Sequence, residues 1–79
     1  MNIKVIGLDL AKNVFQVHGV DGSGRALLRR QLKRREVREF FAKLSPTLVG
    51  MEACGGAHYW AREMSQLGHR VKLINPKYV

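Results

Sequence analysis

The chain has 79 residues, of which 46% are hydrophobic and 25% are charged, a composition that excludes a disordered polypeptide and indicates one small folded domain or part of a larger one. Lys and Arg number 14 against 6 Asp and Glu, so the formal net charge is +8, which favours polyanionic partners. The single cysteine excludes an internal disulfide and a multi-cysteine zinc site.

The first 32 residues are predicted to form a three-stranded antiparallel meander. Residues 3–9 are β-branched and almost continuously apolar, as in a central strand buried on both faces. A second apolar run follows at 14–20. The sequence Asp21-Gly22-Ser23-Gly24 then predicts a tight turn, because glycine accepts positive φ and Asp caps its own turn. Residues 25–32 are expected to form the strand that closes the hairpin.

The second half of the chain changes to alternating helices and strands. An apolar stripe at helical spacing predicts a helix over 33–44, which ends at Ser45-Pro46. A buried strand is predicted over 47–52, a second helix over 57–67 with Gly68 as its stop, and a last strand over 70–74. The stripe of the first helix consists of Val37, Phe40, Phe41 and Leu44, and that of the second of Ala57, Trp60, Ala61, Met64 and Leu67. We expect Trp60, Met64 and Leu67 to pack in the core rather than to form a binding stripe.

The order βββαβαβ favours an α/β fold with a mixed sheet, in which the first strand is central and the strand order is 3-2-1-4-5. Right-handed crossovers that move in one direction along the sheet place both helices on the same face. The other face then has no helix within these residues, and we expect a further C-terminal segment or another chain to cover it. Residues 1–79 are therefore predicted to be a single partial domain, truncated before a C-terminal helix.

Two acidic residues follow strands that this order makes neighbours. Asp9 ends the first strand and Glu52 ends the fourth, so both carboxylates are expected at one edge of the sheet. Carboxylate oxygens are ligands suited to Mg²⁺ or Mn²⁺, the ions used in phosphoryl transfer at DNA. The alternative is that both residues are polar groups at strand ends with no catalytic role.

Four segments, which lie near Asp9, near Glu52 and close to the end of the chain, resemble blocks of the DEDD-type insertion-sequence transposases, a family that includes Piv-like DNA invertases. They are IGLDLAKNVFQVH at 6–18, GMEACGGAHYWAR at 50–62, LGHRV at 67–71 and INP at 74–76. The resemblance covers essentially the whole chain. It implies a RuvC-like domain with an RNase H-like fold that acts on DNA, with Asp9 and Glu52 as the first two acids of a tetrad that binds Mg²⁺.

The same resemblance implies partners and missing parts. It implies a structured guide RNA that bridges target and donor DNA, and a homo-oligomer. It puts the last two tetrad aspartates, and a C-terminal domain with a serine implicated in strand exchange, beyond Val79. These 79 residues alone are therefore expected to bind metal weakly and to be inactive. No uncharged stretch is long enough to span a membrane and no secretory signal is present, so a cytoplasmic bacterial protein is expected.

Basic residues and two glycines are further candidates for contacts with nucleic acid. Seven cations and one acid fall between Arg25 and Arg38, which favours contact with a polyanion over a solvated face. Lys12 is a candidate contact for the scissile phosphate, and Gly55-Gly56 would admit a phosphate at a helix start. A solvated lysine and a simple turn are the alternatives. The full set is Lys12, Arg29, Arg30, Lys33, Arg34, Arg35, Arg38, Gly55 and Gly56.

Other functions stay open. Cys54 and His58 are four residues apart, which allows either a thiolate nucleophile or a small buried cysteine. His18 and His69 have no spacing that indicates a metal site. A non-catalytic basic module would bind RNA or DNA without divalent metal. An actin-like or sugar-kinase ATPase lobe also begins with a strand ending in Asp, but it needs glycine and a hydroxyl next, where this chain has Leu10-Ala11-Lys12.

Overall fold

The computed structural model describes residues 3–10, 14–53 and 55–74, which contain seven elements in the order βββαβαβ. The strands are β1 (Val5–Asp9), β2 (Val14–Val20), β3 (Ala26–Lys33), β4 (Leu48–Glu52) and β5 (Arg70–Ile74). The helices are α1 (Arg34–Ala42) and α2 (Ala57–Gln66). Neither helix is long and apolar enough to cross a membrane, as far as the described ranges of the chain extend.

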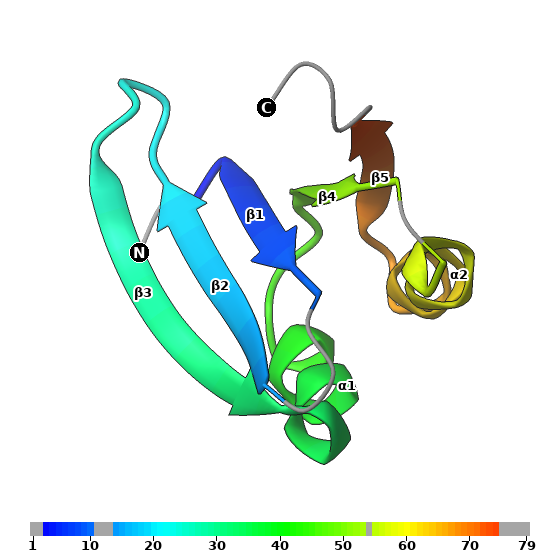
Figure 1. Ribbon diagram of the computed structural model, residues 1–79. Coiled ribbons are helices and arrows are strands. Elements are labelled where there is room, and N and C mark those ends of the chain that lie inside the picture. The colour runs from blue at the N-terminus through cyan, green and yellow to red at the C-terminus, as the bar shows by residue number, and fades with distance from the viewer. Residues whose placement is uncertain (1–2, 11–13, 54, 75–79) are drawn as a thin grey trace.

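The five strands form one sheet in the order β3-β2-β1-β4-β5, as predicted (Figure 1). β1 pairs with β2 and β2 with β3 in antiparallel fashion, whereas β4 runs parallel to both β1 and β5. A short turn suffices for an antiparallel pair, but parallel neighbours need a longer crossover, and here each crossover contains a helix. The α/β class and the mixed sheet expected of an RNase H-like domain are confirmed.

The turn between β2 and β3 is held by Asp21, as its sequence predicted. One carboxylate oxygen of Asp21 accepts hydrogen bonds from the Ser23 hydroxyl (2.8 Å) and from the backbone amides of Ser23 and Arg25 (both 2.9 Å). Gly24 adopts φ = 85°, a value that side chains disfavour. The Ser23 hydroxyl, followed by the Arg25 amide, lowers the pKa of Asp21 below its ordinary value of 3.8.

This lowered pKa predicts how the stability of the turn depends on pH. The charged Asp21 is favoured in the folded chain, so its contribution is present above the unfolded pKa and is lost as the pH falls through the lower folded pKa. In urea unfolding at a series of pH values, Asp21→Ala should therefore lower the midpoint at pH 7. The difference from wild type should shrink between about pH 5 and pH 2. A difference that does not depend on pH would contradict this role of the carboxylate.

Both helices cover the same face of the sheet, as the crossovers predicted. Alternate strand residues such as Ile6, Leu8 and Phe15 are buried in one core with residues of both helices. The residues of the apolar stripe predicted for α1 are not equally buried: Phe41 is fully buried, whereas Phe40 is only partly buried. The buried core consists of Ile6, Leu8, Phe15, Val17, Leu32, Val37, Phe41, Val49, Met51, Ala57, Trp60 and Met64.

The opposite face of the sheet, which we call the open face, is not covered by either helix in the described part of the chain. β1 is therefore buried on one face only, since Ile6 and Leu8 are buried whereas Asp9 is exposed. The open face is also not uniformly apolar. Its centre is formed by the paired glycines Gly7 and Gly50. Other residues on it include Asp9, Gln16, His18, Arg29, Glu52 and Lys72.

One buried histidine joins the end of α1 to the start of β4. His69 is 4% exposed, and its Nδ1 lies 3.1 Å from the Thr47 backbone nitrogen while its Nε2 lies 2.8 Å from the Phe41 carbonyl oxygen. The amide of Thr47 can only donate, so Nδ1 accepts and Nε2 donates to the carbonyl. Both ring nitrogens are thus used within the fold, which gives His69 a structural role.

Candidate functional site

Asp9 and Glu52 occupy equivalent positions at the carboxyl ends of two neighbouring parallel strands. Leu8 of β1 pairs with Met51 of β4, and the next residue of each strand is the acid. Neighbouring strands lie about 4.8 Å apart, and successive side chains alternate between the two faces of a sheet. Leu8 and Met51 are buried in the core, so both acids belong to the open face, where both are exposed.

The two acids line one pocket of about 260 Å³ on the open face. Gly7 and Gly50 also line it, and each lies two residues before an acid. Among the described residues, a Cβ built on Gly7 would have no neighbour closer than 3.9 Å, and one on Gly50 would meet only the end of the Ile74 side chain, at 3.4 Å. The floor of the pocket is therefore backbone, which leaves room beside the carboxylates.

His18 belongs to the same pocket, although no spacing in the sequence connects it with the acids. It lies directly opposite Gly7 in the antiparallel pair of β1 and β2, and it is exposed. Only the strand register reveals this placement. Within the described ranges, no group of three or more His, Cys, Asp or Glu side chains is arranged to hold a metal ion. His18 therefore lines the pocket without completing a three-residue site.

The basic candidates on β3 separate onto two faces. Arg29 pairs with His18 and Lys33 pairs with Val14, which places both cations on the open face. Arg30, between them, points to the helix side, where its guanidinium lies 5.4 Å from the centre of the Phe40 ring. The run of basic residues in the sequence therefore does not become one continuous surface.

The basic candidates on α1 differ in their contacts. Arg38 forms an ion pair with Glu63 of α2, with 2.7 Å between Nη1 and Oε1. The guanidinium of Arg34 lies 5.6 Å from the centre of the Trp60 ring. Arg35 is exposed. Arg34 and Arg38 thus link the two helices as well as contributing positive charge.

The remaining candidates surround the start of α2 or fall outside the described ranges. Lys12 and Cys54 lie outside the described residues. Gly55 and Gly56 are exposed in the turn that leads into α2, and a Cβ on either would have no neighbour within 4 Å in the described part of the chain. His58 is exposed in the first turn of α2. The two glycines therefore leave an open approach to this end of the helix.

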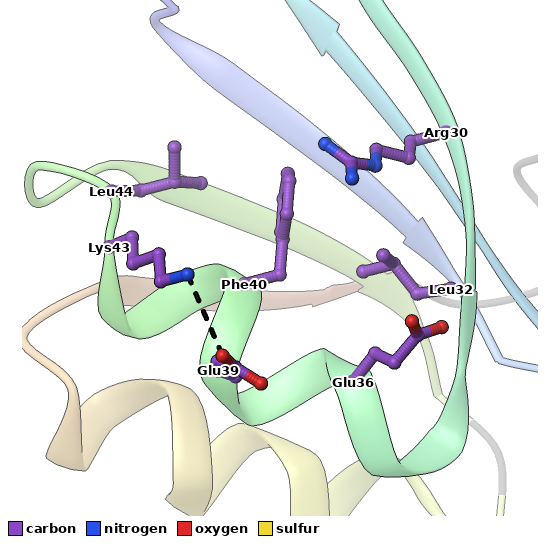
Figure 2. A pocket seen from close by; sticks show the side chains of 7 residues that line it. All are labelled: Arg30, Leu32, Glu36, Glu39, Phe40, Lys43 and Leu44. Atoms are coloured by element: carbon purple, nitrogen blue, oxygen red, sulfur yellow. Dashed lines mark ion pairs between the residues drawn. The ribbon is translucent and has the colours of Figure 1, made fainter.

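A larger pocket of about 330 Å³ lies elsewhere, between β3 and α1 (Figure 2). Arg30 reaches over Phe40 from β3, while Glu36 and Glu39 come from α1 and Lys43 directly follows that helix. Lys43 and Glu39 lie 3.6 Å apart as an ion pair. Because this pocket contains both signs of charge and neither Asp9 nor Glu52 lines it, it is not an extension of the carboxylate site.

The fold and its pocket define an α/β domain with paired carboxylates at the ends of adjacent parallel strands. No family model matches the chain. The chain is 65% identical over 79 residues to a Pseudomonas aeruginosa protein named "Probable family 20 transposase". It is 47% identical over 78 residues to the "Transposase for insertion sequence element IS1328" of Yersinia enterocolitica, and 41% identical over 78 residues to that for IS1111A of Coxiella burnetii.

These similarities cover 99–100% of this chain but only 21–23% of the three relatives, so the chain spans between a fifth and a quarter of their length. All three relatives are named transposases. The names of these relatives confirm that the chain resembles insertion-sequence transposases, as its sequence indicated.

Proposed function

We propose that this chain is part of the catalytic domain of a DEDD-type, RuvC-like insertion-sequence transposase, and that Asp9 and Glu52 hold Mg²⁺ for phosphodiester chemistry at DNA. The observation that carries the proposal is the equivalent placement of the two acids on neighbouring parallel strands, in one pocket. The names of the relatives support the class of protein. The placement of the two acids and the names of the relatives support the proposal independently of each other.

The residues in the pocket fit a hydrated magnesium ion. Mg²⁺ prefers oxygen ligands, keeps several waters, and is commonly bound through one or two carboxylates. Asp9 and Glu52 supply such oxygens, and because both are exposed, water can complete the coordination shell. The backbone floor at Gly7 and Gly50 leaves space for that water. The ion would also offset the repulsion between two neighbouring carboxylates.

Each part of the pocket has a task in this proposal. Asp9 and Glu52 hold the ion, and the glycine floor lets a phosphodiester approach the two strands closely. When bound, Mg²⁺ stabilises the negative charge that develops on the oxygens of the phosphodiester during displacement. Exposed cations outside the pocket, such as Arg29, Lys33 and Arg35, contact backbone phosphates. A guide RNA and a homo-oligomer belong to the same proposal.

A non-catalytic nucleic-acid-binding module is the second candidate. The net charge of +8 favours it, because cations bind phosphates through counterion release without any metal. Such a module would bind DNA or RNA with strong salt dependence, and Asp9 would not matter for binding. The two candidates therefore differ in their response to divalent metal.

Titration of the chain with Mn²⁺, followed by paramagnetic broadening of backbone amide NMR signals, tests the metal site. Broadening is expected first at the carboxyl ends of β1 and β4, around Asp9 and Glu52. Asp9→Asn and Glu52→Gln should each remove most of it, since each replaces a charged oxygen ligand with a neutral one.

Glu39→Gln is the matched control. Glu39 is an exposed acid on α1 that pairs with Lys43 and does not line the carboxylate pocket, so its variant should keep the wild-type pattern. Broadening that is centred elsewhere, or that persists in Asp9→Asn and Glu52→Gln, would overturn the assignment of the site.

A further inference from the structure

One exposed aromatic side chain lies against a buried aromatic pair at the start of α2. Tyr59 is 47% exposed, and its ring meets that of Trp60 edge to face, with 5.1 Å between centroids and an angle of 89°. Trp60 is only 5% exposed and packs on Phe15, with 5.2 Å between centroids. Arg34 lies over the Trp60 ring. We call Tyr59, Trp60 and Arg34 the aromatic–arginine cluster.

The cluster lies at the same edge of the sheet as Asp9 and Glu52. β3 and β1 both run antiparallel to β2, and β4 runs parallel to β1, so the carboxyl ends of β1, β3 and β4 meet at one edge. α1 begins at Arg34, directly after β3. α2 begins at Ala57, shortly after β4. Tyr59 and Arg34 are therefore both in the first turn of a helix that starts at this edge.

Packing alone does not explain an aromatic residue at position 59. The buried positions of α2 are Ala57, Trp60 and Met64, which form the stripe that faces the sheet, and Tyr59 is off that stripe. Its ring is nevertheless held by Trp60, which is itself fixed in the core. The exposed ring is thus in contact with a ring that is itself fixed in the core, which limits its freedom to reorient.

Charge indicates which partner such a surface takes. Lys33, Arg34 and Arg35 are consecutive at this edge, and all three are exposed. An exposed aromatic ring next to arginine is the combination that binds single-stranded nucleic acid, because every base has a π face and every nucleotide carries a phosphate. A docking site for a protein would need a contiguous apolar patch, whereas the Trp60 ring that Tyr59 contacts also lies next to the guanidinium of Arg34.

We propose that Tyr59 is a stacking platform for an unpaired nucleotide, and that Arg34 contacts the same nucleotide through its base or its phosphate. The inference rests on the proposed function, since it gives the nucleic acid a fixed point at the edge that contains the carboxylates. It concerns binding alone, however, and it requires neither metal nor cleavage. The nucleotide can belong to DNA or to RNA.

The test is binding of short single-stranded oligothymidine, oligouridine and a DNA duplex to the chain in EDTA. Trp60 is the single tryptophan, so its fluorescence reports contact at the cluster, and anisotropy of labelled strands gives the affinity. Tyr59→Leu keeps an apolar side chain but removes the π face. It should weaken single-strand binding by about 5- to 100-fold, while Tyr59→Phe stays within about twofold of wild type.

Two further measurements keep the test specific. Duplex affinity should change little in Tyr59→Leu, because bases within a duplex already stack on each other. Arg70→Ala, at the opposite edge of the sheet, removes one exposed cation and should weaken single strand and duplex alike. The ratio of the oligothymidine and oligouridine affinities shows whether DNA or RNA is the source of the nucleotide.

Unchanged single-strand affinity in Tyr59→Leu would overturn the proposal, and so would an equal loss for duplex and single strand. Comparison with the Mn²⁺ titration separates this inference from the proposed function. If stacking at Tyr59 survives in EDTA while the chain shows no Mn²⁺ site, the platform stands and the metal assignment fails. If the Mn²⁺ site is present and Tyr59→Leu has no effect, the metal assignment stands and the stacking platform fails.

Discussion

Asp9→Asn, in a full-length transposase that carries this segment, is expected to reduce Mg²⁺-dependent DNA strand cleavage by about 100-fold or more. A bound metal contributes several kcal/mol to stabilising the transition state, and each 1.36 kcal/mol corresponds to about a factor of ten in rate. Glu52→Gln should have a similar effect, because the two acids occupy equivalent positions. Cleavage of an end-labelled DNA substrate measures both.

The fold should not be affected by these substitutions, because both side chains are exposed and their replacements have nearly the same shape. DNA binding measured without metal should be retained or slightly stronger, since a negative charge has been removed near the phosphates. Glu39→Gln again serves as control and should cleave at the wild-type rate. Cleavage by Asp9→Asn at the wild-type rate would contradict a catalytic role for the pocket.

Phe15→Ala is expected to lower the free energy of unfolding by about 3–5 kcal/mol, the usual cost of removing a buried phenyl ring. Phe15 is 1% exposed and packs on Trp60, so its loss would leave a cavity between β2 and α2. A domain of this size has a total stability of about 4–12 kcal/mol. The variant should therefore lose a large part of its stability, which a lower urea midpoint followed by circular dichroism would show.

Val14→Ala is the matched control for this prediction. Val14 precedes Phe15 on the same strand, but it lies on the open face and is 39% exposed. Its truncation should change the free energy of unfolding by about 0.5 kcal/mol or less. Equal losses for the two variants would contradict the one-sided helix layer.

The sequence predicted the sheet well because its signals were local and strong. The limits of β2 and β5 agree with the predictions, and the strand order followed from the order of elements. α1 was predicted over 33–44 but extends from Arg34 to Ala42. Lys33 still pairs with Val14 in the sheet, and the chain after Ala42 turns toward β4. The helical spacing of apolar residues does not reveal that Lys33 still belongs to the preceding strand.

The candidate site was only partly accessible from the sequence. The adjacency of Asp9 and Glu52 follows from strand order, but the inclusion of His18 depends on the antiparallel register of β1 and β2, which no spacing encodes. For the run of basic residues, nearness in the sequence was misleading. Arg29 and Arg30 are neighbours in the chain, yet strand alternation sends them to opposite faces of the sheet. Charge counted along the sequence does not measure charge density on a surface.

The alternation along β1 ties the two acids to the hydrophobic core. Leu8 and Asp9 are consecutive, and so are Met51 and Glu52, with the apolar residue of each pair buried and the acid exposed. If β1 slipped by one residue against β4, Leu8 would move into water and Asp9 would face the helices. Burial of the core therefore also selects the register that forms the pocket, because the register that buries Leu8 is the one that places Asp9 on the open face.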